Sequence, residues 1–136
     1  LNTEIVDFIS SGIDFFTFEE IQNDESGNDL PVSPEFNGNL NIVYKVPISD
    51  KLSFEASVDY IYQSEMFWDI PNQVSQDAYG LLNARVGATS RNLDLFFWGK
   101  NLTDEVYFSY GYGVGGFNAA SFGLPTTYGV TVTGKF

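Results

Sequence analysis

Hydrophobic and polar residues alternate with a period of two along most of the chain, which is the pattern of a β-strand with one apolar and one polar face. The clearest strand carries six apolar residues on one face: Leu52, Phe54, Ala56, Val58, Tyr60 and Tyr62. Similar alternation predicts strands at residues 39–46, 82–88, 93–100 and 126–136, and a weaker one at Leu1–Phe8. The pattern therefore predicts an all-β chain of about six antiparallel, up-and-down strands without a helix.

The connections between these strands alternate between short and long. The predicted short turns are Pro47–Lys51 and Ser90–Asn92, and the predicted long connections are Ile9–Glu35, Ser64–Ala78 and Leu102–Pro125. In an up-and-down sheet, every second connection lies at the same end. Transmembrane barrels of the outer membrane show this asymmetry, with short periplasmic turns and long extracellular loops.

Strand length and aromatic placement also favour a membrane barrel. The strands Leu52–Gln63 and Thr126–Phe136 are about as long as the roughly 9–11 residues that cross a bilayer at a tilt, whereas average strands have about 5–6. Aromatic rings gather at the loop-side strand ends, with Phe136 at the opposite end, as expected of residues at a membrane interface.

Composition narrows the function further. Only 18% of residues are charged, against about 25% in soluble domains, while 17% are aromatic. The net charge of −12 excludes the basic surface that nucleic-acid binding requires. The chain has neither His nor Cys, which excludes histidine-based catalytic triads and thiolate or imidazole metal sites. We therefore predict no catalytic residues, no metal site and no cofactor.

Alternation alone is equally compatible with a soluble β-sandwich, because both folds have one apolar and one polar face. Two alternatives thus stay open: a different outer-membrane barrel (a passive porin or an enzyme), and a soluble carbohydrate-binding sandwich. The position of the apolar faces decides between membrane and soluble folds. The chain begins at Leu1 without a signal peptide, so we expect its parent protein to extend further upstream.

Three segments, in order and at consistent spacing, resemble motifs of one family. Leu30–Phe36 followed by Asn39 and Leu40 is similar to the L-P-x-x-P segment before a late strand of TonB-dependent receptors. Leu95–Tyr107 resembles a strand followed by N-L-T-D-x-x-Y. Gly123–Val130 resembles the P-R-x-Y-G entry to the last strand, with Thr126 where Arg is common. The resemblance covers residues 30–136.

The resemblance implies a segment of a 22-stranded barrel with a plugged lumen in the bacterial outer membrane. The chain would supply about the last six strands, residues 1–136, with the plug domain and earlier strands absent. The family imports scarce nutrients, such as ferric siderophores or cobalamin, and its members are not enzymes. The implied partners are outer-membrane lipid and lipopolysaccharide, the rest of the barrel and plug, the inner-membrane TonB complex and a small-molecule ligand.

Candidate functional residues fall into three groups. Aromatic rings in long loops offer contact area at low entropy cost, so the ligand-contact candidates are Phe67, Trp68, Tyr107, Tyr110, Tyr112 and Phe117, with packing within the loops as the alternative. The C-terminal residues Tyr128, Val130, Val132 and Phe136 resemble the signal that the outer-membrane assembly machinery reads, although Gly134 departs from the pattern. The polar strand faces predict ion pairs in the barrel lumen among Glu55, Asp59, Asn83, Arg85, Asp94 and Lys100.

Two further motifs have ordinary interpretations. Asn101–Asp104 matches a glycosylation acceptor, but side-chain capping of a strand-to-loop turn is the expected role. Asn23–Asp29 superficially suggests a calcium loop, yet it lacks the required spacing, so a solvated acidic loop is expected. Weak divalent-cation binding that bridges to lipopolysaccharide is the alternative for this loop.

Overall fold

The computed structural model describes residues 4–14, 16–114 and 117–136, and they fold into strands, turns and irregular segments. The chain forms two compact units. Residues 1–37, 63–79 and 107–123 form one, here called the loop unit, and residues 38–62, 80–106 and 124–136 form the other, here called the wall unit. No helix among the described residues is long and apolar enough to cross a membrane. The prediction of an all-β, antiparallel fold is confirmed.

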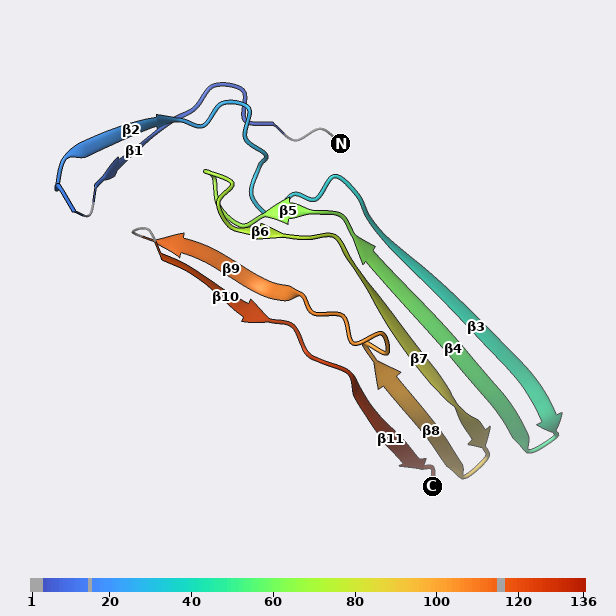
Figure 1. Cartoon of the computed structure of the whole chain (residues 1–136). Helices are drawn as coiled ribbons and strands as arrows, with labels where there is room; N and C mark the ends of the chain where they lie inside the picture. The colour runs from blue at the N-terminus through green and yellow to red at the C-terminus, as the bar shows by residue number, and fades with distance from the viewer. Residues whose placement is uncertain (1–3, 15, 115–116) are drawn as a thin grey trace. The chain divides into compact units, whose positions relative to one another are not determined.

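The wall unit is built on one five-stranded sheet in which each strand pairs with its neighbour in the series (Figure 1). The order across the sheet is β11-β8-β7-β4-β3, so the strands run up and down. Their bounds are β3 Asn37–Ser49, β4 Leu52–Gln63, β7 Tyr79–Ser90, β8 Leu93–Lys100 and β11 Thr127–Gly134. Such lengths suit strands that cross a bilayer.

The short turns are tighter than predicted. Only Asp50 and Lys51 separate β3 from β4, and only Arg91 and Asn92 separate β7 from β8. The predicted first turn was too long because Pro47 was assigned to it, whereas Pro47 lies within β3, a strand at an edge of this sheet. Proline is tolerated in edge strands because they have a side without a hydrogen-bonded neighbour.

The three predicted long connections are not structureless, because each contains a short antiparallel hairpin of the loop unit. These hairpins are β1 (Ile9–Ile13) with β2 (Glu20–Asp24), β5 (Met66–Phe67) with β6 (Ser75–Gln76), and β9 (Phe108–Val114) with β10 (Phe117–Phe122).

The predicted strand at Leu1–Phe8 is wrong for residues 4–8, and residues 1–3 lie outside the described residues. This segment forms a single bridge, from Glu4 to Asp29. Its backbone bonds the turn after β2 instead of a wall strand: the Ile5 N–H donates to the Asn28 carbonyl and the Gly27 N–H to the Ile5 carbonyl, both at 2.8 Å. The apolar alternation at this end therefore belongs to an irregular extension of the first hairpin.

The register of β7, β8 and β11 aligns residues of like polarity in rows across the sheet. The apolar rows are Ala84–Gly99–Tyr128, Val86–Phe97–Val130 and Ala88–Leu95–Val132. The intervening rows are Arg85–Trp98–Gly129, Gly87–Phe96–Thr131 and Thr89–Asp94–Thr133. Because side chains alternate between the faces of a sheet, one face is apolar and the other mostly polar.

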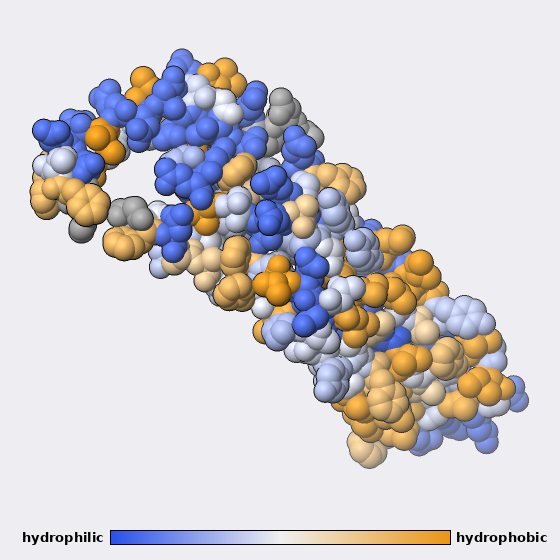
Figure 2. All heavy atoms as spheres, viewed as in Figure 1, coloured by the Kyte–Doolittle hydropathy of each residue, from blue (hydrophilic) through white to orange (hydrophobic). Residues whose placement is uncertain are grey.

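The apolar face of the wall unit is exposed. Ile42 is 59% exposed, Phe97 53% and Val130 55%. Among the described residues, the buried hydrophobic side chains are only Met66, Val74 and Phe96, so this face is not the inside of a two-sheet core. Figure 2 shows hydrophobic residues over much of the visible surface of the long strands. This arrangement contradicts the soluble sandwich and fits a sheet whose outer face meets lipid.

Phe96 departs from the two-face pattern, because its ring lies on the polar face and is only 5% exposed. Gly87 makes room for it: a Cβ atom at Gly87 would lie 2.6 Å from Phe96 Cδ1 and 2.1 Å from the Leu95 carbonyl oxygen. The Arg85 guanidinium covers the ring, with its Cζ 3.5 Å from the ring centroid. A cation–π contact thus shields the Phe96 ring on the polar face.

Two neighbouring substitutions in the middle of β3 test the assignment of the faces. In the full-length receptor, Ile42→Lys puts an ammonium on the lipid side and should destabilise the barrel by about 2–4 kcal/mol. Asn41→Lys, one residue away on the polar face, is the matched control and should change stability by less than about 1 kcal/mol. Urea unfolding in lipid vesicles measures both. Equal effects of the two substitutions would contradict the assignment.

Candidate functional site

The polar face of the wall unit carries a charge network that joins neighbouring strands. Glu55 on β4 accepts Lys45 Nζ of β3 at 3.4 Å and lies 3.8 Å from Arg85 Nη1 of β7. Asp94 on β8 pairs with Lys135 Nζ at 2.6 Å. The predicted ion pairs are thus confirmed for Glu55, Arg85 and Asp94. Partly exposed pairs contribute at most about 1 kcal/mol each, so their main effect is to fix side-chain positions.

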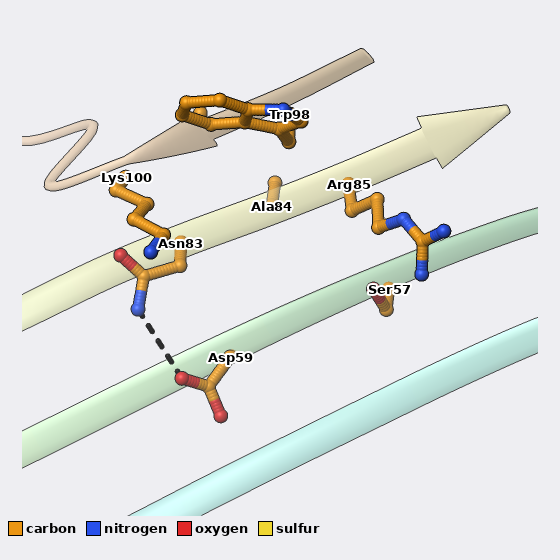
Figure 3. A pocket seen from close by; sticks show the side chains of 8 residues that line it. Ser57, Asp59, Asn83, Ala84, Arg85, Trp98 and Lys100 are labelled. Atoms are coloured by element: carbon orange, nitrogen blue, oxygen red, sulfur yellow. Dashed lines mark hydrogen bonds between the residues drawn. The ribbon is translucent and has the colours of Figure 1, made fainter. Parts of the chain in front are cut away.

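Asp59 and Asn83 lie beside this network in a hollow of about 360 Å³ on the polar face. Asn83 Nδ2 donates to Asp59 Oδ2 at 3.2 Å, so Asp59 binds an amide here rather than a cation. Figure 3 shows Lys100, Asn83 and Asp59 at one end of the hollow and Arg85 with Ser57 at the other. Mixed polar groups with exposed cations suit a hydrated barrel lumen better than a catalytic centre.

Asn101, directly after β8, is the hydrogen-bonding centre of the wall unit and is 4% exposed. Its Nδ2 donates to the carbonyls of Glu105 (2.9 Å) and Leu124 (3.1 Å), while its Oδ1 accepts the Glu105 N–H at 2.9 Å. Its own N–H donates to Asn83 Oδ1 at 3.0 Å. These contacts confirm the predicted capping role, and burial of Asn101 is incompatible with its glycosylation in this fold.

Asp104 and Thr126 close the same turn. The Thr126 N–H donates to Asp104 Oδ1 at 3.1 Å, and the Thr126 hydroxyl donates to the Asn101 carbonyl at 2.6 Å. The backbone hydrogen bond from Thr126 lowers the pKa of Asp104 below its ordinary value, and the hydroxyl adds to this effect. Together with Asn101, these residues join the beginning and the end of the third long connection. Thr126, which departs from the family motif, is therefore a structural contact.

Three of the six predicted ligand-contact residues come together in the loop unit. The ring centroids of Trp68 and Tyr110 are 5.8 Å apart, and those of Tyr110 and Tyr112 are 5.9 Å apart. Gly111 lets the indole approach β9, since a Cβ atom there would lie 2.6 Å from Trp68 Cδ1. Tyr110 is 58% exposed and Tyr112 47%, so both tyrosine rings present aromatic surface to solvent. We call these three residues the aromatic cluster.

The other three candidates lie elsewhere in the loop unit. Tyr107 stacks on Tyr79, with centroids 4.7 Å apart. Phe67 is half-buried in β5, where it pairs with Ser75. Phe117 begins β10 and is 75% exposed. Stacking of Tyr107 and burial of Phe67 fit the alternative of packing within the loops, so ligand contact by these residues remains a prediction.

Two amide side chains that sequence reasoning missed help to join the connections of the loop unit. Asn72 Oδ1 accepts the Asp29 N–H at 2.7 Å and Asn72 Nδ2 donates to the Asp29 carbonyl at 3.0 Å, which links the first and second connections. Gln76, 4% exposed, accepts the Phe108 N–H and so links the second connection to the third. The Pro71–Asn72 pair indicates a turn, but nothing local indicates its distant partner.

The prediction of a solvated acidic loop at Asn23–Asp29 is wrong for Glu25, which is 4% exposed. Its carboxylate accepts hydrogen bonds from the Ser10 hydroxyl at 2.7 Å and from Asn28 Nδ2 at 2.8 Å. Asp24 instead accepts the Ser26 N–H, and hydrogen bonding with Ser26 lowers its pKa below the ordinary value. No cluster of metal-ligating side chains is found among the described residues.

The proposed assembly residues Tyr128, Val130 and Val132 share the apolar face of β11. Phe136 lies beyond the end of β11 rather than within it, because the strand ends at Gly134. The Lys135 N–H still donates to the Asn92 carbonyl at 2.9 Å, which holds the segment next to the β7–β8 turn. Their role in assembly is untested and remains a prediction.

A meander of long strands with an exposed apolar face, a charged polar face and hairpins in every second connection defines a segment of an outer-membrane β-barrel. Residues 6–102 match the family model described as TonB dependent receptor-like, beta-barrel. The chain therefore belongs to the TonB-dependent receptor family, whose members are transporters of the outer membrane and not enzymes. The matched region starts earlier than the predicted resemblance and leaves out the segment at Gly123–Val130.

A solved structure gives the same fold. The chain is similar to the ferric yersiniabactin uptake receptor FyuA from Yersinia pestis, with a TM-score of 0.72 and 18% sequence identity. The similarity covers 83% of this chain but only 19% of FyuA. At this identity the comparison shows the fold alone.

Substitution of Asn101 tests its role in the wall. Asn101→Ala in the full-length receptor leaves two carbonyls and one N–H without their partner and should destabilise the barrel by about 3 kcal/mol. Asn101→Asp removes both donors and should destabilise it similarly. Exposed Thr103→Ala is the control and should lie within about 0.5 kcal/mol of wild type. Urea unfolding in vesicles is the measurement, and wild-type stability of both Asn101 variants would contradict the role.

Proposed function

We propose that this chain is the C-terminal part of the barrel of an active-transport receptor that imports a scarce nutrient, with a ferric siderophore or cobalamin as the expected class. The exposed aromatic cluster is the observation that carries the ligand-binding part of this proposal. The chain contributes barrel wall, outer loops and, through Tyr128, Val130, Val132 and Phe136, the assembly signal.

The sheet itself supports a larger barrel. The strands β3 and β11 are the two edges of the five-stranded sheet. In a bilayer, an open edge would expose unpaired backbone groups to lipid at a cost of several kcal/mol each. We infer that further strands of the same receptor pair with both edges, and that a plug domain and a segment contacting the inner-membrane TonB complex belong to the part outside residues 1–136.

Orientation follows from the position of the turns. The two-residue turns at Asp50–Lys51 and Arg91–Asn92 share one end of the sheet, and we assign that end to the periplasm. The hairpins then belong to extracellular loops, where the aromatic cluster is available to a ligand. Lipid and lipopolysaccharide contact the outer surface, and the ion pairs of Glu55 face the lumen.

Cellular uptake tests the proposal. A strain lacking the receptor gene should lose uptake of iron-55 supplied as chelates from iron-limited culture medium, or of cobalt-57 cobalamin, and the wild-type gene should restore it. A protonophore should abolish the restored uptake, because the transport is energised. Uptake that persists with the protonophore would instead support a passive porin, and receptor-independent uptake of both labels would contradict the proposal.

Substitutions in the aromatic cluster test whether it contacts the transported substrate. Tyr110→Leu removes a ring from the cluster, which should cost about 1 kcal/mol and raise the half-saturating substrate concentration about fivefold. Tyr44→Leu makes the same chemical change on the apolar face of β3 and should leave this concentration unchanged. Equal concentrations for Tyr110→Leu and wild type would remove the cluster from the ligand site.

A further inference from the structure

The two units differ completely in charge. The wall unit contains every Lys and Arg of the chain: Lys45, Lys51, Arg85, Arg91, Lys100 and Lys135. It also contains six acids, Asp50, Glu55, Asp59, Asp94, Asp104 and Glu105, and is therefore neutral. The loop unit contains the other twelve acids: Glu4, Asp7, Asp14, Glu19, Glu20, Asp24, Glu25, Asp29, Glu35, Glu65, Asp69 and Asp77. The whole net charge of −12 thus belongs to the loop unit.

No side-chain cation within the loop unit offsets this charge. The ion pairs found among the described residues, Lys45–Glu55, Arg85–Glu55 and Lys135–Asp94, all lie in the wall unit. A surface of one sign creates a potential of several kT, which concentrates opposite charges and repels like charges. Membrane anchoring does not need this charge, because the apolar face lies on the wall strands. The charge is therefore free to act on a ligand.

The aromatic cluster adds a second and independent preference for cations. The faces of Trp and Tyr rings attract ammonium and other cationic groups. Asp69 lies next to Trp68 in the chain, and its Oδ1 accepts the N–H groups of Gln73 (3.0 Å) and Val74 (2.9 Å), which fixes the carboxylate. Its Oδ2 would lie 3.7 Å from a Cβ atom at Gly113, the residue that follows Tyr112 in β9. The fixed carboxylate thus lies against β9, the strand that carries the exposed rings of Tyr110 and Tyr112.

We propose that the loop unit selects a positively charged ligand, whose cationic group binds the aromatic cluster beside Asp69. This inference rests on the proposed function, since it specifies the ligand of the same receptor. It disfavours polyanionic iron chelates, such as a trianionic ferric tris-catecholate, and favours a chelate or other nutrient that carries an ammonium or a quaternary nitrogen.

Three aromatic quenchers of nearly equal size but different charge test this proposal: the N-methylnicotinamide cation, neutral nicotinamide and the nicotinate anion. Each is titrated against the purified full-length receptor, and subtraction of the Trp68→Phe variant isolates quenching of Trp68. At low ionic strength the cation should quench Trp68 roughly threefold more strongly than the neutral probe, and the anion more weakly. Added salt should remove the difference. Equal quenching by the three probes, or stronger quenching by the anion, overturns the proposal.

Charge variants test whether the carboxylates near Trp68 cause the difference in quenching between the cationic and anionic probes. Glu65→Gln, Asp69→Asn and Asp77→Asn together remove the three carboxylates of the segment that carries Trp68, and Asn at 69 can still accept the two backbone N–H groups. This triple variant should lower the cation-to-anion ratio at least twofold. Asp50→Asn, in a short turn of the wall unit, is the matched control and should leave it unchanged. An unchanged ratio in the triple variant overturns the proposal. The quenching measurement does not depend on transport. Failure of the proposed transport function would therefore appear in the uptake experiment and not in the quenching ratios.

Discussion

The fold depends on one constraint: in the hydrocarbon region of a bilayer, every backbone N–H and C=O must find its partner within the protein. Long antiparallel strands joined by two-residue turns meet this requirement across the five-stranded sheet. The same constraint keeps irregular backbone out of the wall strands: the left-handed residues Phe18 and Asn72 lie in the loop unit, and Asn101 and Asp104 follow the end of β8. Water on the polar face and lipid on the apolar face then require the two-residue alternation of the sequence.

Polar side chains complete the structure where the strand ladder ends. Asn101, itself in a left-handed conformation (φ 49°), satisfies backbone groups on both sides of the third long connection. Asn72 and Gln76 do the same among the hairpins of the loop unit. Buried amides suit this role because they donate and accept without the desolvation cost of a charge. The hairpins are thereby joined into one body that can present the aromatic cluster in a defined arrangement.

The sequence predicts those features that depend on local periodicity. The bounds of β4 and β8 agree with the prediction. The predicted strand at residues 82–88 was too short, because Gly80 and Ser90 stand where the alternation requires apolar residues, although both lie within β7. The prediction of a strand at Leu1–Phe8 fails because the pattern of apolar residues does not show that this segment forms hydrogen bonds with the turn after β2. Aromatic residues identify candidates for ligand contact, but only the approach of Trp68 to Gly111 shows which of them meet. Burial of Glu25 depends on the distant Ser10 and is equally invisible in the sequence.

This fold requires that the apolar face meets lipid while the polar face meets water. The most direct measurement is nitroxide scanning of residues 39–46 on β3, with the full-length receptor in a bilayer. Accessibility to oxygen should peak at residues 40, 42, 44 and 46, and accessibility to a water-soluble nickel complex should peak at residues 39, 41, 43 and 45. Accessibility without a two-residue period, or with the two reagents exchanged, would exclude this orientation of the two faces.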